Sequence, residues 1–172
     1  EMTDADVQAF LDLCAQNDID VYVDGGWGVD ALLGYQSRAH SDLDVAIPQK
    51  DSALVRALLE ELGFIEVPRN DSWECNYVMG DSRGCLIDIH TFTFDENGKL
   101  VSGVEYPFAS LRGSGVIAGR PVKCITPEWM VKFHTGYPLD ENDWHDVQHL
   151  CDKFQLPIPD EYQSFFRDSY RQ

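Results

Sequence analysis

Apolar side chains recur three and four residues apart in several segments, which is the spacing of one face of a helix. The first such segment follows Thr3, a typical N-cap residue. A second covers residues 27–33 and should end at Gly34. Three further helices are predicted: one capped by Asp51 or Ser52 and ending at Gly63, with Leu54, Val55, Leu58, Leu59 and Leu62 toward the core; one that begins at Thr126-Pro127; and one over residues 141–154.

Other segments alternate between apolar and polar residues, as half-buried strands do. The clearest covers residues 85–94, and shorter ones cover residues 20–24 and 42–47. Strands are also predicted at residues 64–67 and 73–79, and a hairpin at residues 116–124 that turns on Ala118-Gly119-Arg120. The predicted order, α-β-α-β-α-β-β-β and then helices, is typical of an α/β (α+β) fold, in which helices pack on a mixed β-sheet.

Length and charge narrow the functional classes. A chain of 172 residues is one domain, or one domain with a helical appendage. Its 13 basic and 30 acidic residues give a net charge of −17. Such a chain lacks the basic face that nucleic acid requires. It suits a cationic small molecule, although acidity also serves solubility alone.

The expected cellular location is inferred from the lack of membrane-spanning and signal segments in the sequence. No apolar run has the length of a membrane span, and the acidic N-terminus does not resemble a signal peptide. Five cysteines without a CxxC pair are typical of reduced, buried thiols. We therefore expect a cytoplasmic protein with no membrane partner.

Three carboxylates lie on predicted strands. Asp42 and Asp44 are two residues apart, so they point to the same face of their strand. Asp88 stands between Ile87 and Ile89, where an isolated charge is costly. If the two strands are neighbours, the three carboxylates converge, and a divalent cation such as Mg²⁺ would relieve their repulsion. The alternative for Asp42 and Asp44 is a solvent-facing strand edge.

Gly25 and Gly26 stand where the first predicted strand meets the following helix. Backbone amides at such a junction can face a phosphate at the positive end of the helix dipole. A Gly-Gly pair by itself more often marks a turn. Its position before the strand of Asp42 and Asp44 favours a phosphate site.

Four segments together resemble a known family. These are GGWGVDALLG with RAHSDLD (residues 25–34 and 38–44), LIDIH (86–90), FHTGY (133–137) and DWHDV (143–147). The chain is similar to the DNA polymerase β-like nucleotidyltransferases, and more narrowly to the lincosamide and aminoglycoside 2''-nucleotidyltransferases. Many relatives carry Lys-Asp where this chain has Asn142-Asp143, which favours the lincosamide group.

The resemblance implies roles for individual residues. Asp42, Asp44 and Asp88 would bind the metal ions, two Mg²⁺ that Mn²⁺ could replace, and Asp88 would also accept the proton of the attacking hydroxyl. The amides of Gly25 and Gly26 would contact phosphate, as would the side chains of Arg38 and His40. Residues 1–125 would form the nucleotidyltransferase core, and residues 126–172 a C-terminal helical segment packed on it as one structural unit.

The reaction implied is transfer of AMP from MgATP, or of NMP from another NTP, to a hydroxyl of a small cationic antibiotic, a lincosamide first and an aminoglycoside second. A non-catalytic or toxin-neutralising protein of the same fold is the third alternative. Acceptor contacts are expected at seven positions: Glu74, Tyr77, His90, His134, Tyr137, Asp143 and Asp146. His90 could equally pack within its strand. The resemblance also allows a homodimer.

Overall fold

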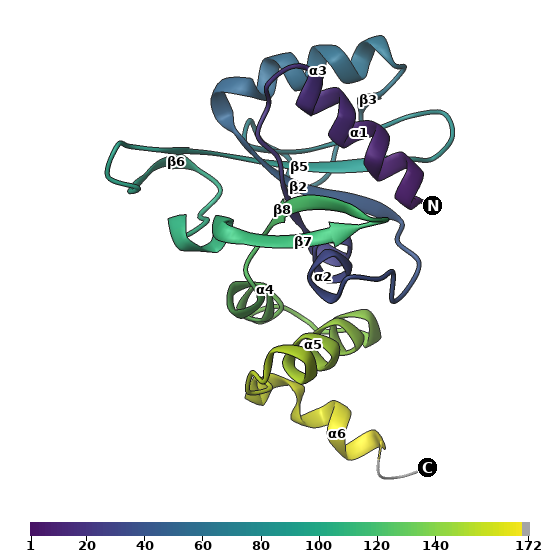
Figure 1. Ribbon diagram of the computed structural model, residues 1–172, viewed down its shortest axis with the longest axis vertical. Helices are drawn as coiled ribbons and strands as arrows, with labels where there is room; N and C mark the ends of the chain where they lie inside the picture. Colours follow the sequence, from purple (N-terminus) through teal and green to yellow (C-terminus); the bar gives the residue numbers. More distant parts are fainter. Residues whose placement is uncertain (170–172) are drawn as a thin grey trace.

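The computed structural model describes residues 1–169. Figure 1 shows a twisted sheet with helices on both faces. The strands are β1 Tyr22–Asp24, β2 Asp42–Pro48, β3 Ile65–Glu66, β4 Asn76–Gly80, β5 Leu86–Phe94, β6 Leu100–Gly103, β7 Gly113–Ile117 and β8 Arg120–Cys124. They are arranged in the order β3-β4-β5-β2-β1-β8-β7, and β6 pairs with β5. The β1–β8 and β2–β5 pairs are parallel and the others antiparallel, so the predicted mixed sheet is confirmed.

The helices divide between the two faces of the sheet. They are α1 Asp4–Gln16, α2 Gly25–Leu33, α3 Ser52–Glu61, α4 Pro127–Phe133, α5 Glu141–Phe154 and α6 Gln163–Ser169. In Figure 1, α1 and α3 lie on one side of the sheet, and α2, α4 and α5 lie on the other. Helix α6 follows α5 at the end of the molecule that lies farthest from the sheet. Helices α4, α5 and α6 thus follow the last strand, and α2 contacts both α4 and α5.

Local sequence accounts for most helix ends. Thr3 and Asp6 form a reciprocal capping box at the start of α1, and Asp140 and Asp143 form another at the start of α5. Helix α2 ends at Gly34, whose φ of 87° is in the left-handed region that glycine favours. The predicted hairpin also forms, since β7 and β8 are joined at Ala118-Gly119.

Some predictions about elements are wrong. Leu54 and Leu62 were expected in the core, but they are 43% and 62% exposed, because the buried face of α3 is narrower than predicted and consists of Ser52, Val55 and Leu59. Strand β4 begins at Asn76, three residues later than predicted. Strand β6 and helix α6 were not predicted.

The core is continuous through both faces of the sheet. Trp27 is 2% exposed, and its indole N–H donates to the Met2 carbonyl, so its role is packing. All five cysteines are buried and unpaired, as expected. Within residues 1–169, no helix combines the length and the apolar character that crossing a bilayer requires.

Candidate active site

The register of three neighbouring strands gathers carboxylates on the sheet face that α2 covers. Asp44 of β2 lies directly opposite Asp88 of β5, and on its other side opposite Asp24 of β1. Residues paired in this way point to the same face. Asp42 is two residues before Asp44 and shares that face. The predicted convergence of Asp42, Asp44 and Asp88 therefore occurs, with Asp24 as a fourth member.

This crowding is unfavourable for the charged forms. Burial, and then the carboxylates of Asp42, Asp24 and Asp88, raise the pKa of Asp44 well above its usual value. Burial also raises the pKa of Asp88, an effect that His90 opposes. Like charges held this close repel one another unless a cation neutralises them.

A metal ion fits between these side chains. One carboxylate oxygen each of Asp44 and Asp88 and a ring nitrogen of His90 lie within 4.8 Å of one another. The His90 Nε2 atom is 3.4 Å from Asp88 Oδ1. Carboxylate oxygens are the ligands that Mg²⁺ prefers, so the chemistry of the cluster suits that ion. His90 thus faces the carboxylates and does not pack against the core.

Gly25 and Gly26 begin α2 directly beside the cluster. Gly25 has a φ of 57°, and a Cβ atom built on it would overlap with the Asp44 carboxylate. A Cβ on Gly26 would lie 2.5 Å from His40 Nδ1 and 2.7 Å from Arg38 Nη2. Any side chain at either position would therefore overlap with neighbouring side chains. The N-terminus of α2, Arg38 and His40 meet at one place, as an anion site requires.

Arg38 and His40 are each held by a carboxylate. Arg38 donates from Nε and Nη2 to the two oxygens of Asp146, at 2.9 and 2.8 Å. His40 Nε2 is 2.5 Å from Asp30 Oδ2, and both residues are buried. The His40 Nδ1 edge is the one that faces Gly26.

Two hollows open on the carboxylates. The larger has a volume of about 490 Å³. Its lining contains Asp24, Asp42 and Asp44, the predicted phosphate-site residues Gly25, Gly26, Arg38 and His40, and His90, Phe133, His134, Tyr137, Asp143 and Asp146. The smaller, of about 350 Å³, lies beside Asp88 and is lined also by Arg69, Asp71, Ser72 and Asn76. Asp42 and His90 border both hollows.

Some of the residues expected to contact the acceptor line the larger hollow with accessible side chains, and others are buried. Tyr137 and Asp143 line the larger hollow, where the Tyr137 hydroxyl donates to Asp143 Oδ1 at 2.8 Å. The other Asp143 oxygen accepts from the Asp140 N–H, so this carboxylate also caps α5. Asp146 was expected to contact an acceptor, but it is 2% exposed and bound to Arg38. His134 is also buried, and its Nε2 lies 3.6 Å from Asp146.

Two acceptor predictions do not agree with the structure. Tyr77 borders the smaller hollow, but it lies opposite Ile89, so its ring points to the face away from Asp88. There it is 2% exposed, and its hydroxyl is 2.8 Å from the Ser52 hydroxyl. Glu74 precedes β4, is exposed, and lines neither hollow.

Sequence reasoning missed Asp24 and Tyr106. One oxygen of Asp24 accepts from the Gly25 N–H at 2.8 Å, and the other accepts from the Tyr106 hydroxyl at 2.7 Å. Tyr106 is 5% exposed, and burial together with Asp24 raises the pKa of its hydroxyl well above the usual value. Asp24 ends a strand directly before Gly25, which is a usable signal. Tyr106 stands outside any motif.

Solved structures share this fold. The lincosamide antibiotic adenylyltransferase LnuA, solved with lincomycin bound, is 25% identical with a TM-score of 0.76, over 87% of this chain and 96% of its own. ANT(2'')-Ia in complex with adenylyl-2''-tobramycin shares the fold at 21% identity and a TM-score of 0.73, over 98% of this chain and 96% of its own. The fold is that of a nucleotidyltransferase.

The sequence identifies the family. Residues 6–150 match the model of the aminoglycoside-2''-adenylyltransferases, and the chain belongs to this family. A lincosamide resistance protein of Staphylococcus haemolyticus is 30% identical over 87% of this chain and 94% of its own length. A 2''-aminoglycoside nucleotidyltransferase of Klebsiella pneumoniae is 26% identical over 80% of this chain and 77% of its own. The predicted resemblance and enzyme class are confirmed.

Proposed function

We propose that this enzyme transfers the AMP group of MgATP to a hydroxyl of a lincosamide. The observation that carries the proposal is the direct pairing of Asp44 with Asp88 beside the Gly25-Gly26 start of α2. This pairing joins a candidate metal site to a candidate phosphate site. Such a combination serves in-line transfer of a phosphoryl group and has no evident use in a protein that only binds a partner.

Each group of residues then has its own role in the reaction. The triphosphate lies against Gly25, Gly26, Arg38 and His40. Asp88 accepts the proton as the acceptor oxygen bonds to the α-phosphorus, and the bond from that phosphorus to the bridging oxygen breaks to release pyrophosphate. Bound Mg²⁺, held by Asp42, Asp44 and Asp88 at two sites and replaceable by Mn²⁺, would lower the pKa of the hydroxyl and neutralise phosphate charge. His90, within reach of Asp88, orients the acceptor or joins the metal ligands.

The acceptor is assigned from charge and from relatives. Asp140 and Asp143 lie in the larger hollow with Tyr137, and their charge suits a protonated amine. Among the relatives, the lincosamide resistance protein is the more similar and aligns over nearly its whole length. The family name and the Klebsiella pneumoniae relative favour an aminoglycoside as the second candidate.

A panel of acceptors tests the proposal. The purified protein is incubated with each NTP, Mg²⁺ and lincomycin, clindamycin, kanamycin, gentamicin or streptomycin, and the antibiotic is analysed by mass spectrometry. We expect lincomycin and clindamycin to gain one AMP group. Modification of kanamycin or gentamicin alone would replace the lincosamide with the second candidate. No modification of any acceptor, although MgATP binds, would refute an antibiotic substrate.

Compartment and assembly belong to the same proposal. A reaction that consumes ATP, in a chain with five free thiols, suits the reducing cytoplasm. We also propose that the enzyme forms the homodimer that the resemblance allows. Light scattering after size-exclusion chromatography measures this directly, and the mass of a monomer at micromolar concentration would refute it.

A further inference from the structure

Helix α5 reaches the phosphate site through two consecutive residues, His145 and Asp146. Asp146 holds Arg38 through two parallel hydrogen bonds, although the two residues are 108 positions apart in the sequence. A bidentate pair of this kind fixes the plane of the guanidinium as well as its position. The C-terminal segment therefore orients a side chain that belongs to the nucleotide site.

Asp146 is a buried anion dedicated to this contact. Its side chain is 2% exposed, whereas that of Arg38 is 22% exposed. Burial alone would raise the pKa of Asp146, but Arg38 and His134 lower it below the usual value. The charged form is thus stable where it lies. A buried carboxylate that is paired with Arg38 and lies beside His134 has little capacity left for a substrate amine.

Arg38 remains able to bind phosphate while it is held. A guanidinium carries five N–H groups. Two of these donate to Asp146, and one donates to the Ala39 carbonyl at 3.2 Å. The remaining two, on Nη1 and Nη2, have no partner within the part of the chain that the structure describes. Nη2 is the atom that a Cβ on Gly26 would approach, so one free N–H lies at the start of α2.

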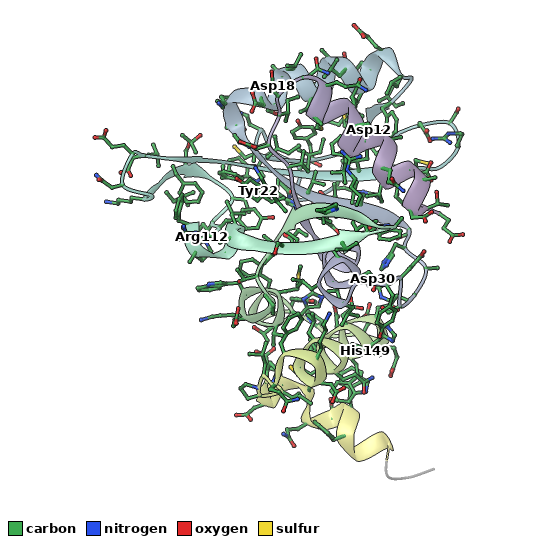
Figure 2. All side chains as sticks on the ribbon, in the orientation of Figure 1. Asp12, Asp18, Tyr22, Asp30, Arg112 and His149 are labelled. Carbon is green, nitrogen blue, oxygen red and sulfur yellow. The ribbon has the colours of Figure 1, made fainter. Side chains whose placement is uncertain are left out.

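A second path joins α5 to His40. His145 Nε2 is 3.0 Å from the Ser37 hydroxyl, which in turn donates to Asp30 Oδ1 at 2.5 Å. The other oxygen of Asp30 holds His40. Figure 2 shows Asp30 of α2 and His149 of α5 on the same side of the sheet, where the two helices meet. His149 is the ring that stacks on His145, with centroids 4.1 Å apart.

We propose that α5 is part of the nucleotide site: Asp146 positions Arg38, and the path from His145 through Ser37 and Asp30 positions His40. This inference rests on the proposed function, because it assigns Arg38 and His40 to the triphosphate. Neither Asp146 nor Asp30 touches the substrate. Both are positioning residues that keep two donors aimed at one anion, which lowers the cost of ordering those side chains when MgATP binds.

Asp146→Asn tests the proposal. The amide keeps the size of the side chain but can accept only one of the two Arg38 bonds, so we expect MgATP to bind about 10-fold more weakly. The KM for ATP should rise in parallel, and the KM for lincomycin should not change. Asp152→Asn is the matched control, since Asp152 is exposed on the same helix and the charge change is equal. Its affinity for MgATP should equal that of the wild type.

A double-mutant cycle separates positioning from general stability. If Asp146 acts through Arg38, Asp146→Asn should weaken MgATP binding in the wild type and have almost no further effect in Arg38→Ala. A purely structural role would give equal losses in both backgrounds. His145→Ala, which changes only the second path, should weaken binding about 3-fold and decides the question if Asp146→Asn does not fold.

The outcomes are distinguishable. Unchanged MgATP affinity in both Asp146→Asn and His145→Ala would overturn the inference, and so would additive losses in the cycle. A raised KM for lincomycin with an unchanged KM for ATP would also overturn it, because Asp146 would then be an acceptor residue. Failure of the wild-type enzyme to bind any NTP would refute the proposed function itself.

Discussion

Replacing Gly26 by alanine should separate nucleotide binding from folding. The new Cβ would lie 2.5 Å from His40 Nδ1 and 2.7 Å from Arg38 Nη2. Neither side chain can move easily, because Asp30 holds one and Asp146 the other. At least one of the two proposed phosphate donors must therefore be displaced. A hydrogen bond to a charged group contributes about 1.5–3 kcal/mol. The expected loss in MgATP affinity is then about 10- to 150-fold.

Stability should change little in the same variant. Gly26 is not among the residues with positive φ, so alanine can adopt its backbone conformation. Alanine in a helix is favoured over glycine by about 0.5–1 kcal/mol, which offsets part of the steric conflict. Isothermal titration with MgATP and thermal unfolding of the same preparation measure both quantities.

Gly34→Ala is the matched control at the other end of α2. Gly34 has a φ of 87°, and nothing lies within 4 Å of a Cβ built there. The strain should cost about 1 kcal/mol and lower the Tm by about 2–4 °C, with MgATP affinity unchanged. Unaltered MgATP affinity in Gly26→Ala would show that Gly25-Gly26 is only a turn. Weakened binding in Gly34→Ala would show that the assay reports stability.

The remaining predictions concern the carboxylates, His90 and the acceptor. Asp44→Asn should abolish turnover yet raise the Tm of the metal-free protein at pH 7. Because the pKa of Asp44 is raised in the folded state, the free energy of unfolding falls as the pH rises above the usual pKa of an aspartate, and the amide removes this penalty. A lower Tm would contradict the reasoning. Asp42→Asn should also abolish turnover, and near-normal activity would remove it from the metal ligands. Asp88→Asn should retain much of the MgATP affinity, while its turnover falls by at least about 10²–10⁴-fold. His90→Ala should lower turnover less than Asp88→Asn does. A larger loss of turnover in His90→Ala than in Asp88→Asn would make His90 the base. The KM for lincomycin should rise as salt increases from low to physiological strength, whereas an unchanged KM would exclude attraction by the acidic cleft.

The alternation of side chains along the strands was enough to predict which carboxylates share one face of the sheet. The two-residue spacing of Asp42 and Asp44 and the apolar neighbours of Asp88 give each carboxylate a face, and the β2–β5 register then brings them together. The same rule exposes the error at Tyr77. Val78 pairs with Asp88, so the side chain one residue earlier must point to the opposite face. A strand boundary misplaced by a few residues hides this parity.

Other features depend on tertiary contacts that no local pattern encodes. The sequence predicted an acceptor contact for Asp146, and only the fold reveals that its partner is Arg38. Strand β6 lies in a glycine-rich segment with weak alternation and forms by pairing with β5. Leu54 and Leu62 fit the helical spacing, but the buried face of α3 consists only of Ser52, Val55 and Leu59, and the spacing alone does not give the width of that face.

The five buried cysteines can serve as natural probes of local unfolding. Burial raises the pKa of Cys14 and of Cys124 to about 12, so almost no thiolate forms at these two residues at neutral pH while the fold is intact. Cys14 lies on α1, Cys124 ends β8 and Cys151 lies on α5, so the thiols are distributed over both faces of the sheet. An alkylating reagent would therefore label each region only when that region unfolds. Mass spectrometry of the labelled peptides would record, without any engineered probe, whether α5 separates from the sheet before the rest of the molecule melts.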